Sequence, residues 1–325
     1  MMLIDNYGRK ITYLRVSVTD RCNLRCIYCR PEGYSIPRLS HEEILRYEEI
    51  LRIVKLAVKL GIRKIRITGG EPFVRKDIDM FIKELSKISG IEELTITTNG
   101  VLLTKYLSIL KIAGVKTLNI SLDTLRSARY KIITGKDEFF KVWTAIHEAK
   151  KMGFRAIKIN VVLLKGINED EVMNFAELSI KEPFYIRFIE HMPICSGNDD
   201  LFLVSGKDVR EFLKKRFELS VLNEDKSTFY PGPARYYKIK GAKGVLGFID
   251  PMTSHFCNMC NRIRLTADGH LKPCLLSSHQ IDIKSPLRAG ANDEDIKALI
   301  IKAVKEKPMF HKNNNIGRAM STIGG

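Results

Sequence analysis

Short runs of β-branched residues alternate with amphipathic helical patterns over roughly the first 195 residues of the chain. This alternation is typical of parallel strands joined by crossover helices. The expected strands begin at residue 14 and follow at residues 64–68, 94–97, 117–121, 156–163 and 185–189. Six such units are fewer than the eight of a closed barrel. We therefore predict an α/β fold, an open, partial (β/α)6 TIM-like barrel.

One expected helix has clear signals at both ends. Ser40 and Glu43 have the spacing of a capping box, which predicts that the helix begins at Ser40. Apolar residues then recur at helical spacing, and Gly61 is expected to end the helix.

Polar and glycine-rich segments follow the expected strands. They are residues 22–29 after the first strand, 69–72 after the second, 98–100 after the third and 122–123 after the fourth. The carboxyl ends of parallel strands meet at one edge, where ligands of such folds bind. The adjacent Gly69 and Gly70 would let the backbone approach a ligand there.

The regular alternation fades after about residue 200, where turn signals appear at residues 230–233 and 240–244. We therefore expect two regions, a barrel at residues 1–200 and a C-terminal region at 201–325. The second region would close the open side of the barrel and bind a second metal group.

Charge and hydropathy narrow the functional classes. The chain has 54 Lys and Arg against 37 Asp and Glu, a net charge of +17, which favours an anionic ligand. The lysines are spread along helices and no common nucleic-acid-binding motif is present, so we expect a multiply charged small substrate and no nucleic acid. No apolar run of membrane-spanning length or signal peptide appears, which predicts a cytoplasmic protein without membrane contact.

Seven cysteines form two spaced triplets plus Cys195, an arrangement that indicates metal ligation in a reducing compartment. The first triplet is Cys22-x3-Cys26-x2-Cys29. A [4Fe–4S] cube held by three cysteines keeps one iron open for a small molecule. By spacing alone, a three-cysteine zinc loop is an equal alternative. We read Cys195 as an ordinary thiol.

The second triplet is Cys257-x2-Cys260-x13-Cys274. Zinc is an alternative here too, with His255, His270 or His279 as the fourth ligand. Arg262 and Arg264 alternate along one expected strand, so both guanidinium groups would project to one side and suit a phosphorylated ligand. The chain has no P-loop signature, so side-chain cations would have to hold a nucleotide.

The strand that runs into the first triplet, the aromatic Tyr28 before Cys29 and the Gly69-Gly70-Glu71 segment together resemble the radical S-adenosylmethionine (SAM) enzymes. The resemblance implies that SAM binds at the open iron of the first cluster. It also implies SAM-binding roles for a set of residues that comprises Tyr28, Gly70, Glu71, Ser121 and Met192.

A longer series of motifs resembles the GTP 3′,8-cyclase family of molybdenum cofactor biosynthesis nearly end to end. It includes residues 14–23, 66–72, 97–100, 121–123, 187–190, 257–266 and 320–325. The resemblance implies two [4Fe–4S] clusters with three cysteines each and places the Gly324-Gly325 tail in the active site. The implied GTP contacts are Arg15, Arg66, Thr97, Lys158, Arg262 and Arg264.

The implied activity converts GTP, through a 5′-deoxyadenosyl radical, to (8S)-3′,8-cyclo-7,8-dihydroguanosine 5′-triphosphate. The implied partners are an electron donor and the downstream cyclic pyranopterin monophosphate synthase, and a homodimer is one option for the oligomeric state. Two alternatives stay open: a radical SAM peptide maturase with an auxiliary cluster, and a zinc- and RNA-binding module.

Overall fold

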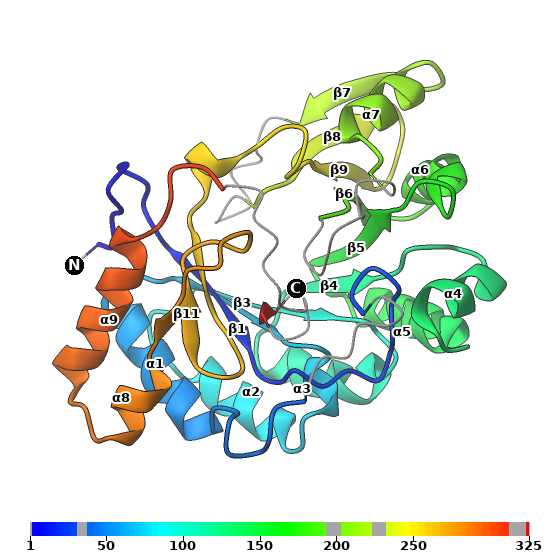
Figure 1. Ribbon diagram of the computed structural model, residues 1–325. Helices are drawn as coiled ribbons and strands as arrows, with labels where there is room; N and C mark the ends of the chain where they lie inside the picture. The colour runs from blue at the N-terminus through cyan, green and yellow to red at the C-terminus, as the bar shows by residue number, and fades with distance from the viewer. Residues whose placement is uncertain (1, 31–37, 193–202, 223–231, 312–322, 325) are drawn as a thin grey trace.

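One curved sheet of 12 strands forms the centre of the molecule in the computed structural model, which describes residues 2–30, 38–192, 203–222, 232–311 and 323–324. The strand order is β12-β11-β10-β1-β2-β3-β4-β5-β6-β9-β8-β7. In this order, the strands from β10 to β9 run parallel to one another. Within the described chain the outer strands β12 and β7 do not pair, so the barrel is open (Figure 1).

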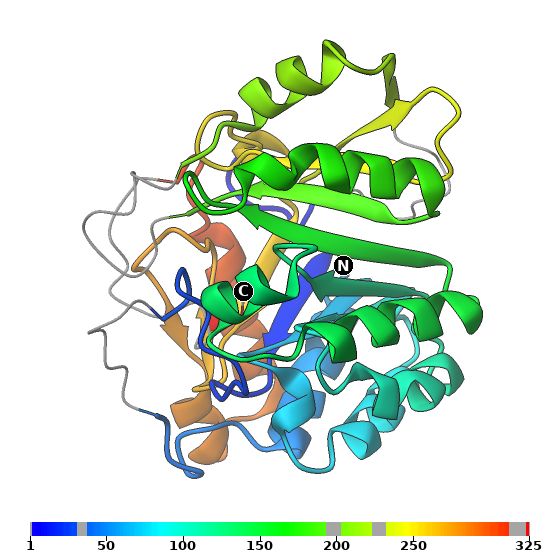
Figure 2. The same cartoon turned by 90° about the vertical axis from the view of Figure 1, so that its right-hand side faces the viewer.

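The six strands expected in the first part of the chain are confirmed. They are β1 (Tyr13–Ser17), β2 (Lys64–Thr68), β3 (Glu93–Thr98), β4 (Thr117–Ser121), β5 (Ala156–Leu163) and β6 (Tyr185–Glu190). The crossover helices lie on the outer side of the sheet (Figures 1 and 2). They are α1 (Tyr47–Lys59), α2 (Ile78–Ser86), α3 (Leu107–Ile112), α4 (Ser127–Thr134), α5 (Phe139–Lys151) and α6 (Val172–Lys181), with short 3-10 turns η1 (Pro72–Val74), η2 (Leu103–Tyr106) and η3 (Glu169–Glu171).

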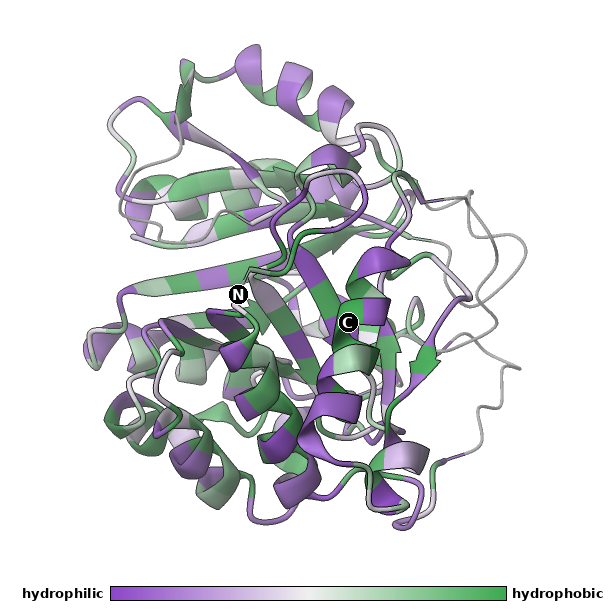
Figure 3. Cartoon of the chain, turned by 90° about the vertical axis from the view of Figure 1, so that its left-hand side faces the viewer, coloured by the Kyte–Doolittle hydropathy of each residue, from purple (hydrophilic) through white to green (hydrophobic). Residues whose placement is uncertain are grey.

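The outer helices are amphipathic, with hydrophilic stretches beside hydrophobic ones (Figure 3). In α1, Ile50, Ile53, Val54 and Ala57 are buried against the sheet, whereas the lysines of the helix are exposed. This division explains the helical spacing of the apolar positions, and the burial of that face is the main stabilising contribution. In the described parts of the chain, no helix combines the length and the apolar character needed to cross a membrane.

The expected start of helix α1 was wrong. Ser40 and Glu43 do exchange the two hydrogen bonds of a capping box, but they close a turn ahead of the helix. The backbone N–H of Leu45 then donates to Ala267 O at 2.9 Å, which ties this segment to the C-terminal part of the chain. The helix begins at Tyr47, and Gly61, with φ +110°, follows its end as expected.

The C-terminal part of the chain contributes strands to both edges of the sheet. Strand β9 (Val245–Ile249) pairs with β6 and is followed outward by β8 (Arg235–Ile239) and β7 (Leu219–Leu222). Strand β10 (Arg262–Leu265) pairs with β1, and β11 (His270–Lys272) and β12 (Ile281–Asp282) extend that edge. The remaining elements are α7 (Gly206–Lys214), η5 (Cys257–Met259), α8 (Lys284–Arg288) and α9 (Asp293–Lys305). The division at residue 200 stays a prediction.

Candidate functional site

The first cysteine triplet lies in the loop that follows β1, and all three thiols line a cavity of about 250 Å³ at the carboxyl ends of the strands. The Sγ atom of Cys22 accepts hydrogen bonds from the backbone N–H of Leu24 at 3.4 Å and from Nδ2 of Asn99 at 3.7 Å. Burial raises the pKa of Cys22 and that of Cys26. A metal cluster fits this donor set, because it binds thiolates and offsets the cost of their burial.

The glycines after β2 are required by the cysteine loop itself. Gly70 donates its backbone N–H to Thr19 O at 2.7 Å, and a Cβ atom added to Gly70 would lie 2.4 Å from Arg21 O. Gly69, with φ +157°, faces Thr19 equally closely. Both glycines also line the cavity, and residues 19–21 provide the protein backbone that comes closest to them.

Replacing Gly70 with alanine is expected to displace the cysteine loop, because the new methyl group overlaps a backbone carbonyl. We expect a loss of about 1–3 kcal/mol in the free energy of unfolding and weaker retention of iron by the first triplet. Chemical denaturation and iron analysis measure both effects. Gly232→Ala is the matched control, since nothing lies within 4 Å of its added Cβ. Equal stability and iron content in the two variants would contradict this account.

The Glu71 carboxylate is fully buried and points into the protein. It accepts hydrogen bonds from Oγ1 of Thr98 at 2.8 Å and from the backbone N–H of Asn99 at 2.7 Å, and burial raises its pKa to about 7. Glu71 does not line the cavity in the described part of the chain. It fixes the end of β3, where Asn99 reaches Cys22, and its contact with SAM stays a prediction.

Tyr28 lines the cavity and is oriented by Asp123, which sequence reasoning did not assign. The Tyr28 hydroxyl donates to Oδ2 of Asp123 at 2.8 Å, and Oδ1 of the same carboxylate accepts from the N–H of Val162 at 2.8 Å. Burial raises the pKa of Asp123 to about 6. The hydrogen bond fastens the cysteine loop to the end of β4, where Ser121 also lines the cavity.

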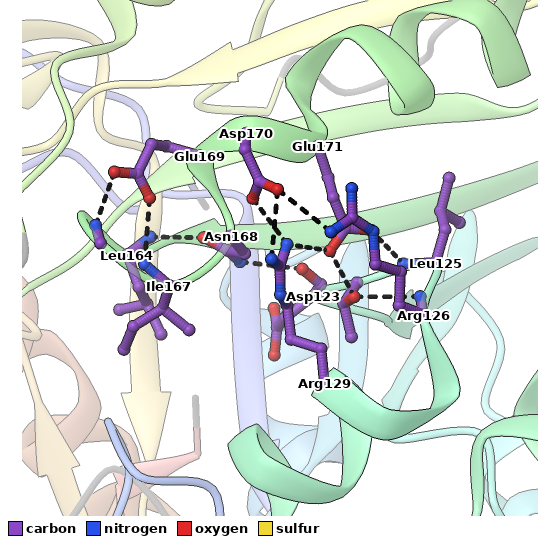
Figure 4. A network of polar contacts seen from close by, with 12 residues as sticks. Asp123, Leu125, Arg126, Arg129, Leu164, Ile167, Asn168, Glu169, Asp170 and Glu171 are labelled. Atoms are coloured by element: carbon purple, nitrogen blue, oxygen red, sulfur yellow. Dashed lines mark hydrogen bonds and ion pairs between the residues drawn. The ribbon is translucent and has the colours of Figure 1, made fainter.

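A network of polar contacts holds Asp123 in place (Figure 4). Nδ2 of Asn168 donates at 2.8 Å to the carbonyl oxygens of Asp123 and Val162. The buried Glu171 accepts from Oγ1 of Thr124 at 2.6 Å and from Arg129. The loops after β4 and β5 are therefore held together, which keeps Ser121 and Asp123 in place.

The second triplet borders a smaller cavity of about 70 Å³ between η5, β10 and the segment after β11. Burial raises the pKa of the Cys260 thiol, but Arg262 and Lys307 outweigh this effect and lower it to about 6. A thiolate at Cys260 suits metal binding. Among the described residues, no three His, Cys, Asp or Glu side chains converge tightly enough to hold one metal ion.

The histidines considered as fourth ligands lie elsewhere. His270 faces Asp268 at 3.2 Å and His279 contacts Glu306 at 2.6 Å. His255 contacts His311 at 2.8 Å and, in contrast to His311, does not line the cysteine cavity within the described chain.

The two cavities adjoin. Both are lined by a common set of residues, Met192, Pro251, Phe256, Arg262, Arg264 and Leu275. The two cysteine triplets thus border adjoining cavities, and Arg262 and Arg264 line both.

A wall of cations lines this space because arginines stand in register on neighbouring strands. Arg264 of β10 pairs with Arg15 of β1, and Arg15 pairs with Arg66 of β2. Burial and the charge of Arg262 lower the pKa of Arg264 to about 10. Nε of Arg66 and Oγ1 of Thr97 are buried and have no hydrogen-bond partner among the described residues. Like charges at this spacing and unsatisfied polar atoms both favour a bound anion.

Most of the predicted ligand contacts line the larger cavity. These are Tyr28, Gly70, Ser121, Met192, Arg15, Arg66, Thr97, Arg262 and Arg264. Lys158 lies on β5 and does not line it within the described chain. Its ammonium lies 5.7 Å from the centre of the Tyr185 ring, and burial followed by Arg187 lowers its pKa well below the usual range.

Arg187 lines the cavity. In the sequence it belongs to the motif at residues 187–190, but no role was predicted for it. It donates from Nη2 to Oδ1 of Asn119 at 2.6 Å and from Nε to Oδ1 of Asn160 at 2.8 Å. A buried arginine held by amides instead of carboxylates keeps its charge available to an anion.

The described end of the C-terminal tail lies inside the curved sheet (Figure 1). Arg264 donates to Gly324 O at 2.5 Å, and a Cβ at Gly324, which has φ +78°, would lie 2.9 Å from Cγ2 of Thr68. Ile323 is buried in a small apolar cluster with Leu276, Met192 and Cys274. This agrees with the expected entry of the tail into the site; Gly325 and Cys195 lie outside the described residues.

Comparisons with known proteins agree with this geometry. Residues 16–179 match the family model of the radical SAM superfamily, and residues 184–313 match that of Molybdenum Cofactor Synthesis C. GTP 3′,8-cyclase from Thermodesulfovibrio yellowstonii is 48% identical over 99% of both chains. The enzyme of the same name from Heliobacterium modesticaldum is 46% identical over 99% of this chain and 100% of its own.

Solved structures share the fold at low sequence identity. Streptococcus suis SuiB superposes with a TM-score of 0.62 at 15% identity and covers 94% of this chain and 68% of its own. SuiB bound to S-adenosylmethionine gives a TM-score of 0.61 at 14% identity, over 96% of this chain and 79% of that one. These likenesses support the open barrel.

Proposed function

Because the chain belongs to the GTP 3′,8-cyclase family of radical SAM enzymes, we propose that it converts GTP to (8S)-3′,8-cyclo-7,8-dihydroguanosine 5′-triphosphate. The observation that carries the proposal is the pair of adjoining cavities, one lined by each cysteine triplet, with Arg262 and Arg264 in the lining of both. A peptide maturase is not favoured, because the relatives that match the full length carry the cyclase name.

The six described cysteines would hold two [4Fe–4S] clusters, with Cys22, Cys26 and Cys29 at the first and Cys257, Cys260 and Cys274 at the second. When bound, the first cluster supplies the electron that cleaves SAM to methionine and a 5′-deoxyadenosyl radical. Tyr28, Gly70, Ser121 and Met192 line the space beside the first triplet and would position SAM there. The segment Gly69-Gly70-Glu71 would bind the amino group of SAM.

The remaining work of the protein is to place GTP. Four arginines would neutralise the charge of the triphosphate: Arg15, Arg66, Arg262 and Arg264. Thr97 would form a hydrogen bond with GTP. Lys158 on β5 would add a further positive charge. The hydrogen at ribose C3′ then moves to the deoxyadenosyl carbon, and C3′ forms a bond to C8 of the guanine. One electron and one proton complete the product. Productive transfer requires reacting atoms about 3–3.5 Å apart in a cavity that excludes water.

The wider setting is part of the same proposal. We place the protein in the cytoplasm, where an electron donor reduces it and the cyclic pyranopterin monophosphate synthase takes the product. The oligomeric state stays open, with a homodimer as one option. The charge of +17 serves the triphosphate in this proposal and not a nucleic acid.

An anaerobic incubation with SAM, dithionite and GTP deuterated at C3′ tests the proposal. We expect about eight irons per chain, a cyclised triphosphate and deuterium in the 5′-deoxyadenosine. GTP deuterated at C2′ is the control and should transfer no label. Bound zinc without iron would reject the clusters, and unlabelled 5′-deoxyadenosine with unchanged GTP would reject the cyclase activity.

A further inference from the structure

Lys307 is a buried lysine beside the second cysteine triplet. It follows helix α9, its side chain lines the smaller cavity, and the residue is 3% exposed. Its ammonium donates to Pro273 O at 2.7 Å and to Arg262 O at 3.0 Å. Pro273 precedes Cys274, and Arg262 follows Cys260 by two residues. One side chain therefore joins the two segments that bring Cys260 and Cys274 together.

No described carboxylate lies within ion-pair distance of the Lys307 ammonium. In the described part of the chain, no Asp or Glu forms an ion pair with Lys307. Burying a cation without an anion is costly, so such a group is expected to face a negative species. The facing groups are the thiol of Cys260 and the ligand space beside it.

Arg9 is another buried cation beside the second cysteine triplet, but its charge has a carboxylate partner. Its guanidinium donates to Cys257 O at 2.6 Å and to Pro308 O at 2.7 Å, and it forms a buried ion pair with Asp5 at 2.5 Å. Arg9 thus anchors both the cysteine loop and the residue after Lys307, while Asp5 neutralises its charge. Of these two residues, Lys307 is the one without a carboxylate partner among the described residues, and its charge adds to those of Arg262 and Arg264 around the same cavity.

We propose that Lys307 is a positioning residue of the second cluster, which holds the Cys260 and Cys274 segments together and favours the reduced form of the cluster. The inference rests on the proposed second cluster. On reduction the cluster gains one electron and becomes more negative, so a nearby buried cation stabilises the reduced state. Net charge and hydrogen bonds around the sulfurs are the protein's main means of setting such potentials.

A redox titration of the reconstituted full chain tests the inference. Lys307→Met should keep both clusters and make reduction of the second cluster about tenfold less favourable, a shift of about 59 mV to more negative potential. Lys307→Arg should stay close to the wild type. Lys305→Met is the matched control, because Lys305 is exposed at the end of the same helix. Electron paramagnetic resonance follows each cluster, and the signal that responds to SAM identifies the first.

The possible outcomes separate cleanly. Loss of the second cluster in Lys307→Met and its retention in Lys307→Arg would also support the inference, through the positioning role. An unchanged potential in Lys307→Met with full iron would overturn it, and so would loss of the cluster in both variants, because charge would then not matter. Wild-type protein with about four irons, or with zinc, would instead reject the proposed second cluster.

Discussion

Replacing Cys26 with alanine is expected to abolish product formation and to lower the iron content from about eight to about four per chain. Cys26 lies in the middle of the first triplet, and its backbone carbonyl accepts from the N–H groups of both Cys29 and Arg30 at 2.9 Å. The variant lacks one of three thiolates, so the remaining two cannot retain the cube. Iron analysis and detection of 5′-deoxyadenosine measure the effect.

Cys195→Ala is the control for this change, because Cys195 belongs to neither triplet in the sequence. It should keep full iron and full activity. A Cys26→Ala protein that still cleaves SAM would show that this triplet does not hold the reactive cluster.

Replacing Arg262 and Arg264 together with alanine should weaken GTP binding by at least about 100-fold. Each charge-assisted contact contributes about 1.5–3 kcal/mol, and a tenfold change in affinity corresponds to about 1.4 kcal/mol. SAM cleavage in the absence of GTP should persist, because the first triplet and the residues proposed to position SAM are unchanged. Anaerobic equilibrium dialysis measures affinity, and 5′-deoxyadenosine formation measures cleavage.

The single variant Arg262→Ala separates substrate binding from the tail, since only Arg264 of the pair contacts Gly324 among the described residues. Arg52→Ala is a matched surface control, because Arg52 pairs with Asp293 far from the cavity lining. Unchanged GTP affinity in the double variant would remove these arginines from the substrate site.

The barrel strands could be predicted because each is short, β-branched and bounded by turn signals. Strands β9 and β10 were not predicted as parallel members of the sheet, since β9 directly follows the antiparallel strands β7 and β8, and β10 follows only the short turn η5. The helix after Ser40 begins at Tyr47, later in the chain than its sequence signals predicted. Its capping box closes a turn at residues 40–43, whereas the helix starts after Arg46, whose backbone N–H donates to Oε2 of Glu49 at 2.6 Å. The hydrogen bond of Leu45 with Ala267 joins distant parts of the chain and could not be read from the local pattern.

Some residues of the site could likewise be predicted from the sequence, and others could not. The cysteines, the paired arginines and the glycines carry their chemistry in local motifs and could be named from the sequence. Asp123 and Lys307 could not, because their roles depend on contacts with Tyr28 and Pro273, far away in the chain. Glu71 belongs to a recognisable motif, but its inward direction is visible only in the fold.

The pairing of β1 with β10 has a consequence for how the chain is made. Strand β1 leaves the ribosome well before its partner on one side, which is synthesised some 250 residues later, at Arg262–Leu265. At about 5–20 residues per second, the emerging barrel waits on the order of ten seconds or more with one edge uncovered. During translation this edge is where we expect chaperones to bind and aggregation to begin.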